Sequence, residues 1–121
     1  MRALFDTNIL IDYLNGVEAA KDEIAKFSTR YISIISWMEV MVGIRDPHHS
    51  LTVRQFLHRF SMISIDFEIS ELAVKIRQQN TIRLPDAIIW ASAEKTDSLL
   101  VTRNSKDFPS ELPFVRIPYR L

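Results

Sequence analysis

Short apolar runs rich in β-branched residues alternate along this chain with longer segments of helical period. The alternation is typical of a parallel sheet covered by helices, because parallel strands are buried on both faces and need a crossover between them. We therefore expect an α/β fold. Strands are expected at residues 3–5, 31–35, 62–65 and 99–102, with a weaker one at 114–117, and helices at about residues 8–15, 18–27, 37–44, 51–60, 68–79 and 85–95.

The length and the composition predict one domain over residues 1–121. The chain has no internal repeat and no Gly/Ser-rich linker. At this length about two-thirds of the surface of the unfolded chain can be buried, so the fold needs no disulfide or structural metal. The absence of cysteine agrees with this and excludes zinc fingers, thiol nucleophiles and disulfide scaffolds.

The charges of the chain balance, with 15 Lys plus Arg against 15 Asp plus Glu. A polyanion site must therefore be local, because the net charge does not attract nucleic acid. The residues before Asp6 are too few for the apolar core of a signal peptide, and no apolar run approaches the roughly 20 residues that span a bilayer. We expect a soluble, cytoplasmic protein with no membrane partner.

Two acidic residues are expected at the edge of the sheet where strands end and helices begin. Asp6 directly follows the first apolar run and precedes Thr7, a candidate N-cap. Asp86 follows Pro85 at the start of an almost wholly apolar helix. Each has a structural interpretation, since a carboxylate at a helix N-terminus caps the helix or is stabilised by its dipole. The carboxyl ends of parallel strands are also where open α/β sheets bind ligands.

Glu39 and a late polar loop are expected at the same edge. Ser36 and Glu39 have the spacing of a capping box at the start of the helix expected at residues 37–44. The strand expected at residues 99–102 empties into a loop that carries Asn104 and Asp107. Independent helix caps would have no reason to recur on one edge of one sheet, so the shared placement favours a common site.

Several carboxylates that lie together repel one another and raise one another's pKa values unless a cation lies among them. Oxygen ligands without Cys or His select Mg²⁺ or Mn²⁺ over Zn²⁺. A magnesium ion of this kind lowers the pKa of an attacking water, which suits phosphodiester hydrolysis.

Three segments resemble the PIN domain family and, within it, the VapC-type toxins of toxin–antitoxin modules. Residues 5–12 (FDTNILID) are similar to the family's hydrophobic-D-T-N opening. Residues 36–43 (SWMEVMVG) are similar to its S-x-x-x-x-E-x-x-x-G segment in shortened form, and residues 84–93 (LPDAIIWASA) to its D-A-x-I-A-A-x-A helix. The resemblance implies the PIN-like fold, a three-layer α/β/α sandwich with a mainly parallel central sheet.

The resemblance implies that Asp6, Glu39 and Asp86 form the catalytic metal site. Relatives often add the acid of a T-x-D segment, where this chain has Asn104. Either Asn104 or Asp107 is a candidate for this fourth position. Three carboxylates and an amide should hold one Mg²⁺ more readily than two, with Mn²⁺ as a substitute.

Other polar residues are candidates for supporting roles at the site. The positioning candidates are Thr7, Asn8, Thr102, Arg103 and Asn104. Candidates for phosphate contacts are Arg45, Arg83, Arg103 and Lys106, with a solvated surface charge as the alternative for each. The three histidines receive no role, since His48 and His49 are expected on an exposed loop.

The resemblance also implies a function and partners. The expected activity is that of a Mg²⁺-dependent endoribonuclease that acts on RNA. The protein is expected to form a homodimer and to be inhibited by a cognate antitoxin. The candidates for lining the antitoxin groove are Trp37, Met38, Met41 and Trp90, which occur at helical spacing. Aromatic and Met residues at this spacing more often belong to the hydrophobic core. The alternatives are a catalytically weak PIN-like RNA-binding or dimerisation module and a housekeeping RNase. A D-x-D phosphatase ranks last, because Asn8 stands where the second Asp belongs.

Overall fold

The computed structural model describes residues 1–121 and contains a five-stranded sheet in the order β3-β2-β1-β4-β5. Every neighbouring pair of strands is parallel, which confirms the predicted α/β class. All five predicted strands are present, although β2 begins and ends two residues before its predicted bounds. The strands are β1 (Arg2–Phe5), β2 (Thr29–Ser33), β3 (Ser61–Ile63), β4 (Leu99–Val101) and β5 (Val115–Arg116).

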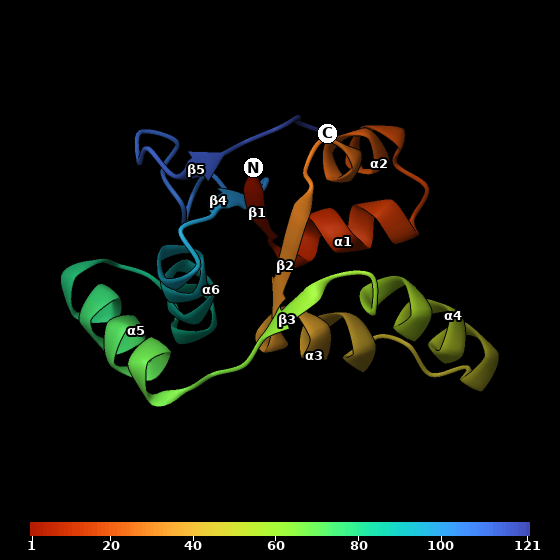
Figure 1. The fold of residues 1–121 in the computed structure, drawn as a ribbon, viewed down its shortest axis with the longest axis horizontal. Helices are drawn as coiled ribbons and strands as arrows, with labels where there is room; N and C mark the ends of the chain where they lie inside the picture. The colour runs from red at the N-terminus through yellow and green to blue at the C-terminus, as the bar shows by residue number, and fades with distance from the viewer.

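Six helices cover the two faces of this sheet, so the predicted three-layer sandwich is confirmed. The helices are α1 (Thr7–Leu14), α2 (Glu18–Ala25), α3 (Ile34–Val42), α4 (Pro47–Leu57), α5 (Phe67–Gln79) and α6 (Leu84–Lys95). Figure 1 shows α1, α2, α3 and α4 on one side of the strands and α5 and α6 on the other.

Alternate side chains of β1 enter two separate hydrophobic cores. Ala3 and Phe5 pack under the helices from the first half of the chain, whereas Leu4 points to the opposite core beneath α5 and α6. All three are fully buried, as expected for the central strand of a parallel sheet, whose side chains alternate between its faces. The position of β1 is therefore fixed from both sides.

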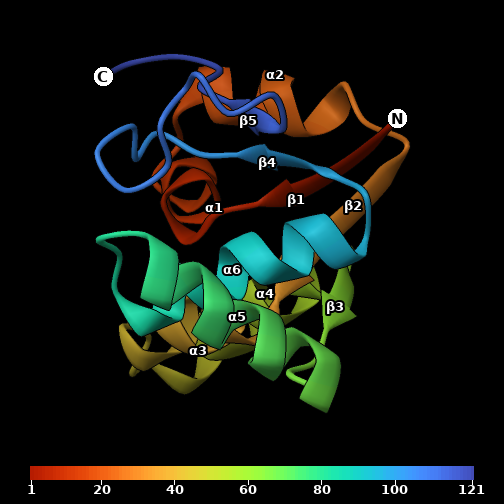
Figure 2. The same ribbon diagram turned by 90° about the vertical axis from the view of Figure 1, so that its left-hand side faces the viewer.

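The sheet reverses its direction of growth between β1 and β4. The chain passes from β1 to β2 and β3 on one side, and from β4 to β5 on the other. Figure 2 shows β1 and β4 side by side. The Asp6 N–H extends their pairing by donating to the Val101 carbonyl oxygen over 2.9 Å. In open α/β sheets this switch point forms the crevice in which ligands bind.

Two predicted helix caps are wrong. The N-cap of α1 is Asp6 rather than Thr7, because the Asp6 carboxylate accepts the Thr7 N–H; this confirms the structural interpretation of Asp6 as a helix cap. The N-cap of α3 is Ser33, whose hydroxyl accepts the Ile35 N–H over 3.1 Å. Ser36 therefore lies inside the helix, and the predicted capping box with Glu39 does not form. The reason is that β2 ends early enough for Ser33 to reach the first free amides of the helix.

His48 and His49 lie in the first turn of α4, so the prediction of a loop is wrong and the prediction of exposure is confirmed. Asp46 caps this helix, and Pro47 occupies the position after the cap. Pro is well suited to the first helical position because it has no N–H to satisfy.

No helix in the structure combines the length and the apolar character needed to cross a membrane.

Candidate active site at the carboxyl edge of the sheet

A polar hollow of about 300 Å³ opens at the switch point of the sheet. Its walls come from α1, α3, the start of α6 and the loop after β4. The structure thus brings Asp6, Glu39 and Asp86 to one pocket, although they are far apart in the sequence. The lining residues are Asp6, Thr7, Asn8, Ile11, Glu39, Arg83, Asp86 and Asn104.

Asp6 is buried at the floor of this acidic pocket, with 4% of its surface exposed. Oδ1 accepts the Thr7 N–H over 2.8 Å, and Oδ2 accepts the hydroxyl of Thr102 over 2.7 Å. Burial raises the pKa of Asp6 to about 6, and the charges of Asp86 and Glu39 add to the increase, while the two hydrogen bonds oppose it. A buried carboxylate with a raised pKa in a pocket is typical of a functional site.

Glu39 projects from the second turn of α3 and is exposed at the rim of the pocket. The Thr7 hydroxyl donates to Glu39 Oε1 over 2.6 Å and lies 2.9 Å from the hydroxyl of Ser36. Thr7 therefore joins the start of α1 to α3 and holds the Glu39 carboxylate beside Asp6.

Asp86 lies in the first turn of α6, as the sequence predicts, and only 7% of it is exposed. Burial raises its pKa, and the nearby Asp107 adds to the increase. Arg83, three residues earlier, donates to Asp86 Oδ2 over 3.2 Å and lowers the pKa in part. The positive group that the sequence analysis expects among the carboxylates is thus provided in part by Arg83.

Asn8 and Thr102 support Asp6 from two different elements. Asn8 Nδ2 donates to Asp6 Oδ2 over 3.2 Å, and Asn8 Oδ1 accepts the Arg103 N–H over 3.1 Å. Thr102 is fully buried, and its hydroxyl also accepts the Asn104 N–H over 2.9 Å. The loop after β4 is therefore fastened to Asp6 through side chains on both sides.

Of the two candidates for the fourth position, Asn104 lines the acidic pocket and Asp107 does not. The side-chain amide of Asn104 donates to Asp107 Oδ2 over 2.9 Å and accepts the Asp107 N–H over 3.1 Å. The charge of Asp107 still reaches the pocket, since it raises the pKa of Asp86. In this arrangement both polar atoms of the Asn104 side chain are occupied by Asp107.

Arg103, a predicted phosphate contact, does not line the pocket in this structure. Its guanidinium forms a bidentate pair with Asp12, over 2.6 Å from Nε and 2.9 Å from Nη2. The Tyr119 hydroxyl donates to the same carboxylate over 2.8 Å. Asp12 is buried, and a buried carboxylate attracts the nearest cation strongly. Arg103 contributes to the site through its backbone and through the position of its loop.

The sequence alone did not identify Asp12, Tyr119 or the contact of the Ser36 hydroxyl with Thr7. Asp12 occurs one and a half turns after Asp6 on a helix with an otherwise apolar buried face, and this buried acid was the available signal. Tyr119 lies in the irregular C-terminal segment, where no periodic pattern indicates a contact.

The four residues predicted as a possible antitoxin groove do not share a surface. Trp90 packs in the core beneath α5 and α6, 5.6 Å from the ring of Phe114. Trp37 and Met41 pack against the opposite core, and Met38 is exposed. A single groove of these four is therefore wrong, and the alternative reading as core fits three of them.

The donor chemistry of the pocket fits a hard divalent cation. All its candidate ligands offer oxygen, and the two buried carboxylates have raised pKa values. No group of three Asp, Glu or His side chains converges closely enough to hold a metal ion directly. Mg²⁺ commonly uses only one or two carboxylates and keeps several waters, so the pocket can hold it without such a triad.

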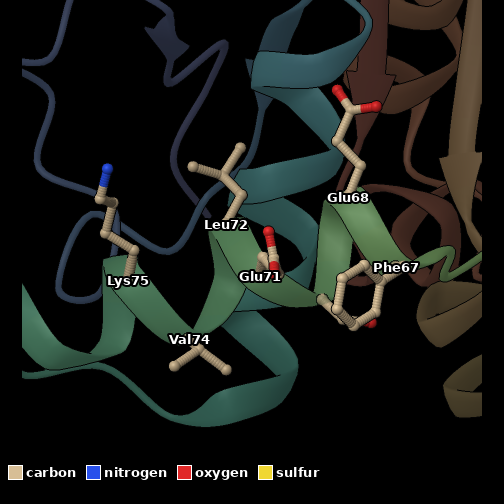
Figure 3. A pocket seen from close by; sticks show the side chains of 7 residues that line it. Phe67, Glu68, Glu71, Leu72, Val74 and Lys75 are labelled. Carbon is tan, nitrogen blue, oxygen red and sulfur yellow. The ribbon is translucent and has the colours of Figure 1, made fainter.

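A larger hollow, of about 690 Å³, lies on the outer face of α5 (Figure 3). Figure 3 shows Phe67, Leu72 and Val74 along it, together with Glu68, Glu71 and Lys75. All its lining residues come from α5, and none of its charged side chains is buried. The acidic pocket is therefore the better candidate for chemistry, although it is the smaller of the two.

Known proteins share the sequence pattern and the fold of this chain. A model of the PIN domain matches residues 3–110. The chain is 44% identical to a chain of a toxin–antitoxin complex from Klebsiella pneumoniae, with a TM-score of 0.92 over 98% of this chain and 99% of that one. A chain of the Rickettsia felis VapBC2 complex with promoter DNA is 25% identical, with a TM-score of 0.70 over 95% and 96% of the two chains.

A chain of DNA-bound VapBC from Salmonella typhimurium shares the fold, with 23% identity and a TM-score of 0.79 over 97% of this chain and 96% of that one. No curated protein matches the sequence.

Proposed function

The chain belongs to the PIN domain family, and on that premise we propose that it is a divalent-metal-dependent endoribonuclease, the toxin of a VapBC-type toxin–antitoxin pair. The proposed cofactor is Mg²⁺, with Mn²⁺ as a substitute. The proposed catalytic unit is the whole of residues 1–121, acting on RNA phosphodiester bonds.

The observation that carries this proposal is the convergence of Asp6, Glu39 and Asp86 on one pocket at the switch point of the sheet. Two of these carboxylates are buried, and the pKa of each is raised by burial and by neighbouring acids. Such an arrangement destabilises the fold when both groups are ionised, and bound positive charge relieves the cost. A divalent cation is the ligand that removes this penalty most simply.

The proposed roles follow from where each side chain lies. Asp6, Asp86 and Glu39 would hold the cation, one or two of them directly and the rest through its waters. The charge of Asp107 would add to theirs through its place beside Asp86. When bound, the cation would supply Lewis acidity, which acidifies an attacking water and offsets the charge that develops on the phosphate oxygens. Thr7, Asn8 and Thr102 would fix the Asp6 and Glu39 carboxylates by the hydrogen bonds described above.

Asn104 would act at the fourth position as a positioning residue. Its amide is bonded to Asp107, and its backbone N–H to the Thr102 hydroxyl. Asn104 would therefore keep Asp107 close to the pocket while adding no charge of its own. This arrangement favours one cation over two, because a second would need more negative charge.

The proposed macromolecular partners come from the family and from the relatives. A 44% identical chain belongs to a toxin–antitoxin complex, which supports a cognate antitoxin as the partner here. We further propose a homodimer and a cytoplasmic location, both implied by the likeness to VapC-type toxins. The mass of the isolated protein in solution, measured by light scattering, tests the homodimer; a monomer at all concentrations would exclude it.

The experiment that tests the activity is cleavage of a panel of structured RNAs in Mg²⁺ or Mn²⁺. Wild type is compared with Asp6→Asn and Asp86→Asn, which remove one charge each from the pocket. Glu71→Gln is the matched control, since Glu71 is an exposed carboxylate on the outer face of α5. Loss of cleavage in the two pocket variants, with full activity in the control, is expected. Full activity in both pocket variants would exclude this site.

Two alternatives give different results. A catalytically weak RNA-binding or dimerisation module would bind the RNAs and leave them intact in both metals. A housekeeping RNase would cleave them, but its expression without an antitoxin would leave cells growing, whereas a toxin should arrest growth. Growth arrest by wild type and its absence with Asp86→Asn is the expected pair of results.

A further inference from the structure

A second hollow, of about 560 Å³, adjoins the acidic pocket and carries the opposite charge. Three of its lining residues are cations, and a single one is an acid. The hollow on α5 has two acids and one cation instead. The lining residues of this basic hollow are Arg77, Thr81, Ile82, Arg83, Lys106 and Asp107.

The basic hollow lies beside the acidic pocket. Arg83 lines both of them. Asp107 lines the basic hollow and is bonded to Asn104, which lines the acidic pocket. Figure 2 shows the connection between α5 and α6 on the same side of the molecule as the loop after β4. An extended ligand that crosses the acidic pocket can therefore continue into the basic hollow.

The cations of the hollow are available to a ligand to different degrees. Arg77 lies in the last turn of α5, and its Nε–H donates to the Ile82 carbonyl oxygen over 3.2 Å. This bond orients the guanidinium and leaves both terminal nitrogens available to a ligand. Lys106 is exposed and makes no salt bridge. Arg83 is 77% exposed in its side chain and shares one nitrogen with Asp86. Unlike Arg103, neither Arg77 nor Lys106 is held in an ion pair within the fold.

We propose that this basic hollow binds a backbone phosphate of single-stranded RNA next to the phosphate that is cleaved. The proposal rests on the proposed nuclease function and names a subsite of the same active site. An Arg guanidinium offers a planar pair of donors that matches two phosphate oxygens, and a Lys ammonium adds a point charge. The Thr81 side chain, also exposed in the hollow, is a further donor to a phosphate oxygen.

The opposite charges of the acidic pocket and the basic hollow give them different roles in binding RNA. The carboxylates of the acidic pocket repel an RNA phosphate, so binding there depends on the cation. The basic hollow attracts phosphate by itself and gives the strand a fixed place and direction across the site. Asp107 also lines the basic hollow and weakens this attraction, but the three cations outnumber it.

The test is the salt dependence of RNA binding, measured in EDTA so that no cleavage occurs. A fluorescently labelled single-stranded RNA is titrated with wild type, Lys106→Gln and Arg77→Gln over a range of KCl concentrations. Each phosphate contact contributes about 0.7 to the slope of log K against log salt for a single strand. Because the cations of the hollow share one phosphate, each variant should lower the slope by up to about 0.7.

Lys75→Gln is the matched control, because Lys75 is an exposed cation on the same helix that lines the hollow of Figure 3 instead. It should keep the slope of wild type. Lys106→Gln keeps the test valid if Arg77→Gln alters the helix end, since Lys106 makes no side-chain bond in the fold. Equal slopes in wild type and Lys106→Gln, or failure of wild type to bind RNA in EDTA, would overturn the proposal.

A walk of neutral methylphosphonate linkages along the same RNA identifies the phosphate. One linkage, adjacent to the cleaved one, should weaken binding by wild type more than binding by Lys106→Gln. The result also separates this proposal from the nuclease function. Cleavage by wild type with unchanged slopes would reject the subsite alone, whereas lowered slopes without any cleavage would support the subsite and reject the nuclease.

Discussion

The Thr102 hydroxyl donates to Asp6 Oδ2 over 2.7 Å, although the two residues are 96 positions apart. Thr102 follows β4 and Asp6 follows β1, the two strands from which the sheet grows in opposite directions. The bond therefore joins the two halves of the fold at the floor of the acidic pocket. The orientation of Asp6 depends on both halves being in place.

Replacing Thr102 by valine should weaken the site more than the fold. The substitution keeps the shape and removes the donor to Asp6 and the acceptor for the Asn104 N–H. Loss of a residue that orients a metal ligand typically costs about 10–100-fold in metal affinity or activity. Calorimetric titration with Mn²⁺ measures this change.

Thr52→Val is the control for Thr102→Val, since Thr52 is exposed on α4 and bonds only the His48 carbonyl oxygen of its own helix. It should leave metal affinity unchanged. Equal Mn²⁺ affinity in Thr102→Val and wild type would show that the bond does not orient a metal ligand.

In the metal-free protein, the free energy of unfolding of Asp6→Asn relative to wild type should be higher at neutral pH than at acid pH. Burial raises the pKa of Asp6 from 3.8 to about 6, so its protonated form favours the folded state. That contribution is fully present below pH 3.8 and is lost as the pH rises through about 6. The variant does not titrate, so it escapes the loss, which amounts to at most about 3 kcal/mol.

Urea unfolding of wild type and Asp6→Asn in EDTA at pH 4 and pH 7 measures the effect. The variant should gain stability over wild type between the lower and the higher pH. The change between the two pH values is the relevant quantity, because the cost of placing an amide among the donors around Asp6 is the same at both. A difference that does not change with pH would mean that Asp6 keeps an ordinary pKa.

Arg103→Gln should act on stability rather than on RNA binding. Only 7% of the Asp12 side chain is exposed, and burial raises its pKa, but the bonds from Arg103 and Tyr119 outweigh this and leave the pKa below its usual value. Removing the guanidinium leaves a buried carboxylate without its cation, at a cost of about 3 kcal/mol. Urea unfolding at pH 7 measures it.

Arg45→Gln is the control for Arg103→Gln, because Arg45 is exposed and makes no salt bridge. It should leave stability unchanged. A double variant with Asp12→Asn should recover part of the loss, since the uncompensated charge is gone. Unchanged stability together with a lower salt slope of RNA binding would restore Arg103 as a phosphate contact.

Glu23→Gln should lower stability at neutral pH and lose its effect in acid. Arg116 on β5 donates to Glu23 on α2 over 2.5 Å and 3.0 Å. Burial raises the pKa of Glu23, but the bonds from Arg116 and Lys26 outweigh it, so the pKa lies below 4.5. The stability is therefore present above about pH 4.5 and is lost as the pH falls through the folded pKa.

The expected cost of Glu23→Gln at pH 7 is about 1.5–3 kcal/mol, the range for hydrogen bonds to charged groups. Asp22→Asn, an exposed neighbour on the same helix, should cost little at any pH. A cost for Glu23→Gln that persists unchanged to pH 2 would contradict the ionic origin of the contact.

The sequence was sufficient for the parts of the fold that repeat a local pattern. The strands and helices could be predicted because apolar periodicity is local, and the placement of Asp6 and Asp86 followed from strand ends and from Pro85. Their arrival at one pocket was predictable because parallel strands end on the same edge of a sheet.

The errors arose where a side chain had two possible partners. Ser33 and Ser36 both suit a helix cap, and the end of β2 decided in favour of Ser33. Arg103 precedes Asn104, which lines the acidic pocket, but its guanidinium binds the buried Asp12 on α1. That pairing joins residues 91 positions apart. The basic hollow likewise joins the end of α5 to the loop after β4, a contact that no local pattern predicts.

The central claim, that the acidic pocket holds a divalent cation for RNA cleavage, is tested most directly with one RNA substrate and a series of Mn²⁺ concentrations. The cleavage rate of Asp86→Asn should fall far below that of wild type at low Mn²⁺ and recover in part as the concentration rises, because the variant binds the cation more weakly. Cleavage by Asp86→Asn at the wild-type rate at every Mn²⁺ concentration would contradict the claim.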